Sequence, residues 1–165
     1  MKIERTQIQR LRIAEADRLD PVTVYMEDYE PGKGKIIIEC YGKSWSSFWG
    51  SMASNTIAEF LCCCDEHYLA KNLSSIDADV IDFDSLDKLL DMECTEDLIK
   101  FDYQLVADAV KRKTGYDMHD FRMPMKPNPE YQYLCRIIRA VQEALETIRT
   151  DRKISIASGE DISDA

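Results

Sequence analysis

The sequence predicts an α+β domain in which a small N-terminal antiparallel sheet of about three strands packs against three to four helices. Three observations favour this class: apolar residues alternate in the first third of the chain, they follow a helical period from residue 55 onward, and no internal repeat occurs. The 165 residues, 45% of them hydrophobic, suffice for one core. We therefore expect a single domain over residues 1–150 and a polar, flexible tail over residues 151–165.

Two strands are predicted by apolar residues at every second position. This alternation covers residues 22–27 and 36–41, and the turn-forming segment Glu30–Gly34 lies between them. The order predicts an antiparallel hairpin. Residues 2–13 show a weaker alternation, and we expect them to add a third strand before the Asp20–Pro21 break.

Helices are predicted in the rest of the chain. Thr56 and Glu59 have the spacing of a capping box, which predicts a helix of about four turns ending near Asn72. A short second helix is expected to begin at Ser85. These two helices would follow the sheet directly and pack on one of its faces.

A longer helix is predicted after Thr95. Two acidic residues lie in its first turn and three basic residues precede Gly115 at its end, as the helix dipole favours. Prolines exclude regular structure between residues 120 and 130, and a last helix follows with an apolar face from Leu134 to Ile148. The apolar stripe expected to bury the helix after Thr95 consists of Leu98, Phe101, Leu105, Ala109 and Val110.

The charge pattern is the main anomaly of the chain. Its net charge of −10 disfavours nucleic acid as the main partner, because polyphosphate would be repelled. Residues 76–102 contain 10 acidic and 2 basic residues, and interspersed apolar residues anchor the segment to a core. An ordinary solvated face is one explanation, and a surface that binds a basic protein is the other. The predicted partner-binding residues are Asp77, Asp79, Asp82, Asp84, Asp87 and Asp91.

Both tryptophans lie in the segment KSWSSFWG, residues 43–50. We expect this segment to connect a strand to a helix. Large aromatic residues on a connection either cover the core or anchor a partner. The core cover is favoured, and Trp45 and Trp49 are retained as further predicted partner-binding residues.

The cysteines predict free thiols. Three of the six are consecutive, Cys62 to Cys64, and the others do not have the spacing of a disulfide framework. Cys63 and His67 are four residues apart on a predicted helix, which gives the alternative of a metal-binding or thiol enzyme. Two ligands do not complete a zinc site, so we expect no metal and no cofactor. A complete site would need another ligand from elsewhere in the chain: His119, Cys94, Cys135 or Cys40.

Four segments carry a resemblance to a group of known proteins. They are VTVYMEDYEPGKGKIIIECYGKSWSSFWG (22–50), TIAEF (56–60), DEHYLAKNL (65–73) and EYQYLCRIIRAVQEALE (130–146). In these segments the chain resembles small accessory proteins of tailed bacteriophages and prophages. The resemblance implies a bacterial host cytoplasm and a non-structural, host-modulating role. It transfers no catalytic or binding residue.

These expectations give one main hypothesis and two alternatives. The main hypothesis is a phage accessory protein that binds a host protein through its acidic surface and so inhibits or redirects a host defence or nucleic-acid-processing enzyme. The alternatives are the enzyme centred on Cys63 and His67 and a structural or assembly homo-oligomer. No catalytic motif is present, which favours a binding protein over an enzyme. The longest uncharged apolar run, Phe60–Cys64, is far shorter than the roughly 20 residues that cross a bilayer, so no membrane is expected.

Overall fold

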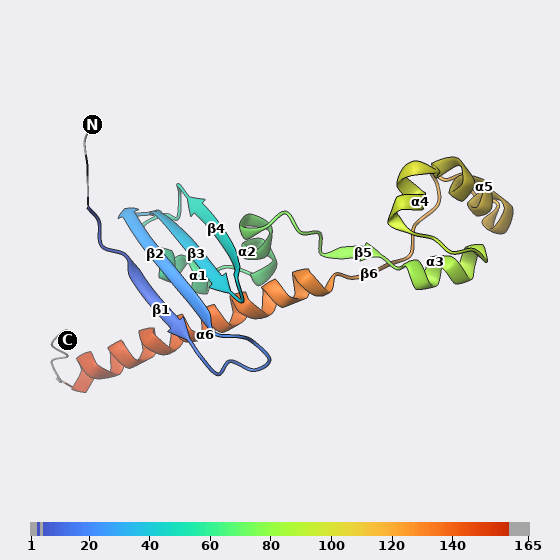
Figure 1. Cartoon of the computed structure of the whole chain (residues 1–165). Helices are drawn as coiled ribbons and strands as arrows, with labels where there is room; N and C mark the ends of the chain where they lie inside the picture. The colour runs from blue at the N-terminus through green and yellow to red at the C-terminus, as the bar shows by residue number, and fades with distance from the viewer. Residues whose placement is uncertain (1–2, 4, 159–165) are drawn as a thin grey trace. The chain divides into compact units, whose positions relative to one another are not determined.

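The computed structural model describes residue 3 and residues 5–158, and it divides the chain into two compact units (Figure 1). Unit 1 consists of Met1–Ile76 and Glu130–Ala165, and unit 2 of Asp77–Pro129. The sequence predicts one domain over residues 1–150. Two units form because the buried apolar residues gather in two separate clusters, one in each unit.

A four-stranded antiparallel sheet forms the first layer of unit 1. Its strands are β1 (Gln9–Ile13), β2 (Val22–Glu30), β3 (Lys33–Cys40) and β4 (Lys43–Trp49), in the order β1-β2-β3-β4. The predicted hairpin of β2 and β3 is confirmed. The predicted connection around the tryptophans is instead a fourth strand, since β4 pairs with β3 from Cys40↔Lys43 to Gly34↔Trp49. Tyr41 and Gly42 join the two strands with positive φ angles of 47° and 73°, as a tight hairpin turn requires.

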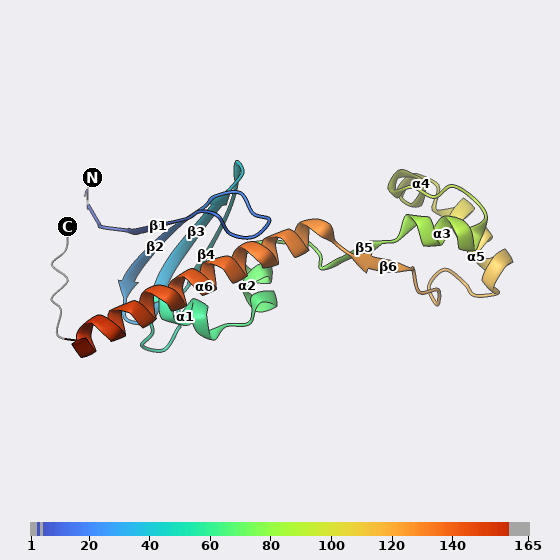
Figure 2. The same ribbon diagram turned by 90° about the horizontal axis from the view of Figure 1, so that it is seen from below.

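Three helices cover one face of this sheet (Figure 2): α1 (Ile57–Cys63), α2 (Glu66–Leu73) and α6 (Pro129–Ser158). Alternate residues of β2 and β3, such as Val24 and Ile38, point into the core between the layers and are fully buried. Leu134, Ile137 and Ile138 of α6 are buried in the same cluster. The α+β fold class is thereby confirmed.

The first predicted helix is two helices. The capping box at its start is present: the Thr56 side chain accepts a hydrogen bond from the Glu59 amide, and Glu59 accepts one from the Thr56 amide. Cys64 then adopts an extended conformation, with φ −91° and ψ 148°. Asp65 begins α2 by accepting hydrogen bonds from the amides of the next two helical residues, at 2.8 and 3.1 Å. The aspartate cap is therefore the local reason for the break.

Unit 2 is built from α3 (Phe83–Leu90), α4 (Glu96–Phe101), α5 (Tyr103–Thr114) and a two-stranded antiparallel ribbon of β5 (Asp79–Ile81) and β6 (Met125–Pro127). The prolines after residue 120 predict no regular structure, yet β6 forms. Pro127 is tolerated because it ends an edge strand. The buried core of unit 2 contains Leu86, Leu90, Cys94, Val106, Ala109 and Val110.

Helix α6 extends further than the sequence predicts. The sequence predicts that residues 151–158 belong to the polar tail, but they continue the helix to Ser158. No proline or glycine interrupts the sequence before Gly159, so no local signal ends the helix earlier. Residues 159–165 of the predicted tail lie outside the described residues. Within the described part of the chain, no helix has both the length and the apolar composition that crossing a bilayer demands.

Candidate functional site

The six aspartates predicted to bind a partner all lie in unit 2, and three of them approach lysines of that unit. Lys126 Nζ lies 3.4 Å from Asp82 Oδ1 and 3.7 Å from Asp84 Oδ2. Lys113 Nζ lies 3.4 Å from Asp91 Oδ2. The negative charge of these three carboxylates is therefore partly compensated within unit 2.

Two of the aspartates also have local structural roles. The Asp87 carboxylate accepts a hydrogen bond from the Cys94 amide at 2.7 Å and so supports the turn after α3. Asp82 accepts a hydrogen bond from the Ser85 hydroxyl at 2.6 Å, and this bond, together with Lys126, lowers the pKa of Asp82. Substitution of either residue would remove a local hydrogen bond of unit 2 as well as a charge.

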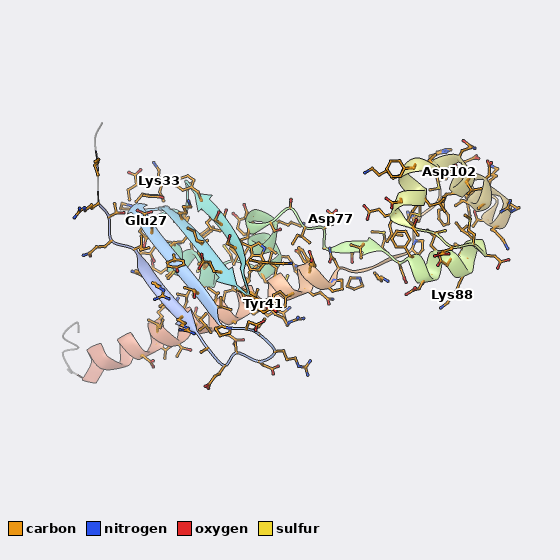
Figure 3. All side chains as sticks on the ribbon, viewed as in Figure 1. Glu27, Lys33, Tyr41, Asp77, Lys88 and Asp102 are labelled. Carbon is orange, nitrogen blue, oxygen red and sulfur yellow. The ribbon has the colours of Figure 1, made fainter. Side chains whose placement is uncertain are left out.

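The negative charge is spread over unit 2. Figure 3 shows Asp77 before β5 and Asp102 between α4 and α5, at opposite ends of the unit. Over the residues that the structure describes, Asp77 and Asp79 have no side-chain hydrogen bond or ion pair, and neither has Asp102. Eight of the ten acidic residues of the segment 76–102 are exposed, and Asp82 and Asp87 are half-buried.

Exposed apolar side chains accompany some of these acidic residues. The helix predicted after Thr95 breaks at Asp102, where φ is −132° and ψ is 51°. The prediction that Phe101 and Leu105 are buried is wrong: Phe101 is 77% exposed, Tyr103 52% and Leu105 47%. The break changes the helical phase, so Val106, Ala109 and Val110 alone supply the buried face of α5. We call the following residues the α4–α5 patch: Glu96, Asp97, Phe101, Asp102, Tyr103 and Leu105.

The two tryptophans lie in the core of unit 1. Trp45 is 9% exposed and Trp49 is 6% exposed. The Trp49 indole N–H donates a hydrogen bond to the Tyr68 hydroxyl at 3.2 Å, and its ring packs against Phe60 with centroids 5.5 Å apart. This burial supports the interpretation as a cover of the core. It leaves the two indoles little surface for a partner, whereas Phe48 on the other face of β4 is exposed.

Cys63 and His67 do not share a helix face. Cys63 is the last residue of α1 and is exposed, whereas His67 belongs to the first turn of α2 after the Asp65 cap. The four-residue relation that suggested a metal or thiol site therefore does not apply across the break.

His67 instead approaches α6. Its Nδ1 lies 3.1 Å from the Tyr131 hydroxyl and 4.0 Å from the Cys135 Sγ, and its ring stacks on Tyr131 at a centroid distance of 5.8 Å. The neighbouring Glu66 forms a two-pronged ion pair with Arg139, in which Nη2 lies 2.6 Å from Oε1. These side chains line a cavity of about 300 Å³.

The electrostatics of this cluster follow from its contacts. Hydrogen bonding to Arg139 lowers the pKa of Glu66, so the carboxylate is ionised. Burial raises the pKa of the Cys135 thiol, which keeps the free thiol protonated and makes it a poor nucleophile. The sequence suggests Cys135 only as one of several residues that a site would need from elsewhere, because no local spacing links positions 67 and 135.

A family model described as a phage family matches residues 1–147. No curated protein and no solved structure matches the chain significantly. The match covers unit 2 and all but the end of α6 in unit 1, and it confirms the resemblance to phage proteins inferred from the sequence. The chain belongs to this phage family.

Proposed function

We propose that this phage protein acts in the host cytoplasm by binding a host protein with a basic surface, and that it thereby inhibits or redirects a host defence or nucleic-acid-processing enzyme. The observation that supports the proposal is the α4–α5 patch, where exposed apolar side chains lie within a few sequence positions of carboxylates that form no ion pair over the described residues. Unit 2 presents this patch on a short helix pair whose buried face is already occupied by its own core.

The composition of the patch resembles that of a protein interface. Phe101 is the most exposed large apolar side chain of the α4–α5 patch. Aromatic residues that become buried at the centre of an interface supply much of the binding energy. Asp97 lies four residues before Phe101 on α4, so the two side chains share a helix face. Asp102 follows directly. Lys100 Nζ also lies 5.3 Å from the centroid of the Phe101 ring. An aromatic residue with several carboxylates and one lysine around it fits a partner that offers an apolar pocket edged mainly by lysine or arginine.

The net charge of unit 2 adds a long-range contribution. Residues 77–129 contain 13 acidic and 7 basic residues, a net charge of −6. Such a field increases the rate of encounter with a basic partner and opposes binding to nucleic acid itself. Inhibition follows if the bound surface is one that the host enzyme uses for its own anionic substrate.

The test is capture of partners from the bacterial host by the tagged full chain, followed by affinity measurements with the purified partner. Phe101→Ala should weaken binding about tenfold or more, since truncation of a central aromatic residue costs at least about 1–2 kcal/mol. Phe48→Ala is the matched control, because Phe48 is 57% exposed but lies on the sheet of unit 1. Equal affinities of both variants and the unchanged chain would contradict the proposal.

A second pair of substitutions tests the acidic residues predicted from the sequence. Asp77→Lys combined with Asp79→Lys reverses two exposed charges with no side-chain partner in the described structure, so the fold of unit 2 should be retained. Weaker binding with a reduced salt dependence would show that the docking surface includes the residues at the start of β5. Unchanged binding would restrict it to the α4–α5 patch. Sedimentation of the purified chain distinguishes both outcomes from self-association.

A further inference from the structure

We propose that Glu66, His67 and Cys135 form a binding site for a divalent transition-metal cation, with Zn²⁺ as the reference ion. One potential ligand atom from each residue lies within 4.8 Å of the other two. Glu66 and His67 come from the first turn of α2, and Cys135 comes from α6, so a bound cation would join the two helices. Thiolate, imidazole and carboxylate are the three ligand types that zinc takes in proteins.

The spacing of the donors is close to that of a tetrahedral site. Zinc–ligand distances of about 2.0–2.3 Å place neighbouring donors about 3.3–3.8 Å apart. Cys135 Sγ lies 4.0 Å from His67 Nδ1, whereas Glu66 Oε1 lies 3.7 Å from the other ring nitrogen, Nε2. An ion binds only one of these nitrogens, and with one donor atom from each residue the three donors lie within 4.8 Å of one another. Binding of one ion therefore requires the donors to approach one another by up to about 1–1.5 Å. The His67 side chain can move in this way because it is 60% exposed, while the buried Cys135 stays fixed in the core.

Neighbouring groups already orient the ligands. Arg139 holds the Glu66 carboxylate, whose two oxygens have four lone-pair sites and so retain acceptors for a cation. Tyr131 stacks on the imidazole and contacts its Nδ1, which fixes the plane of the ring. Outer contacts of this kind tune most metal sites in proteins. The cation would replace the Tyr131 hydroxyl as the partner of Nδ1.

The donor set also determines the kind of ion. A thiolate and an imidazole favour zinc and related transition metals, whereas magnesium and calcium require oxygen ligands. Three protein ligands leave one tetrahedral position open towards the cavity of about 300 Å³, where water or the Tyr131 hydroxyl would bind. All these residues belong to unit 1, so a test of this metal site is independent of any test of the α4–α5 patch in unit 2.

The test is titration of the reduced full chain with Co²⁺, which reports a thiolate ligand through a sulfur-to-cobalt charge-transfer band, followed by displacement with Zn²⁺. We expect one ion per chain. Cys135→Ser should abolish the band. His67→Asn should weaken binding more than the roughly 10–100-fold loss typical of outer-contact substitutions. Cys63→Ser is the matched control and should leave the titration unchanged, since Cys63 is exposed at the end of α1.

Two results would overturn the proposal. The first is the absence of a stoichiometric band in the unchanged chain. The second is a band that survives Cys135→Ser but is lost in Cys63→Ser, which would place the ion on the consecutive cysteines. If Cys135→Ser impairs folding, His67→Asn decides the question, because position 67 is exposed and circular dichroism can verify that the variant is folded.

Discussion

Replacing Gln142 by methionine should destabilise unit 1 by about 1–3 kcal/mol. The Gln142 side-chain amide on α6 donates hydrogen bonds to the backbone carbonyls of Leu61 and Cys64, both at 2.8 Å and both partly buried. Both carbonyls lie at the end of α1, where few helical partners remain: the Leu61 carbonyl also accepts the Cys64 amide at 3.3 Å, and the Cys64 carbonyl lies beyond the last helical residue. Each such bond contributes about 0.5–1.5 kcal/mol net, and two are lost together. Methionine keeps the length and apolar stem of glutamine, so packing changes little.

The assay is urea unfolding followed by tryptophan fluorescence. Both tryptophans lie in unit 1, so the signal reports that unit without a contribution from unit 2. Gln132→Met is the matched control: it is the same substitution on the same helix at an exposed position. A Gln142→Met effect below about 0.5 kcal/mol, the usual range for surface substitutions, would refute the reasoning. So would an equal effect of the control.

Three further predictions concern exposure and capping. Thr56→Ala should destabilise unit 1 by about 1 kcal/mol in the same urea assay, because it removes the cap of α1. Hydrogen bonds from the Thr56 backbone and side chain lower the pKa of Glu59. The stabilisation that they give is present above the unfolded pKa of about 4.3 and is lost as the pH falls through the lower folded pKa. Thr56→Ala removes the side-chain bond and should reduce this acid dependence in unfolding curves measured between about pH 3 and pH 7. Alkylation followed by mass spectrometry should show that Cys63 reacts faster than Cys62, because burial raises the pKa of the Cys62 thiol to about 11. Equal alkylation rates of the two cysteines would contradict this prediction. Phe101→Ser should change the stability of unit 2 by less than about 0.5 kcal/mol, as measured by thermal unfolding, and a larger loss would show that Phe101 is buried.

Local signals predict much of unit 1. The hairpin follows from alternation, and the start of α1 follows from its capping box, because both depend on residues a few positions apart. The strand β4 is missed since its core-facing positions are Trp45, Ser47 and Trp49, and a serine between two tryptophans interrupts the apolar alternation. The pairing of β4 with β3 becomes evident only once the Tyr41–Gly42 turn is recognised as a hairpin turn.

The division into two units depends on long-range packing that no local period contains. Leu86 and Leu134 are equally apolar and equally buried, yet they belong to different clusters. The chain leaves unit 1 after Ile76 and returns at Glu130. Pairing of Asp79 with Pro127 in the β5–β6 ribbon brings the two crossings together, so the insertion requires no long connection. A sequence pattern gives the apolar positions but not the cluster that each one joins.

Both candidate sites arise where a predicted helix breaks. At Cys64 the break ends α1, the Asp65 cap starts α2, and His67 comes to lie beside Cys135, 68 residues away in the sequence. At Asp102 the break shifts the helical phase and exposes Phe101. A periodic apolar pattern predicts burial only while one helix continues, because every side chain beyond a break points in a new direction. Both candidate sites therefore lie where the periodic pattern alone predicts the wrong orientation of the side chains.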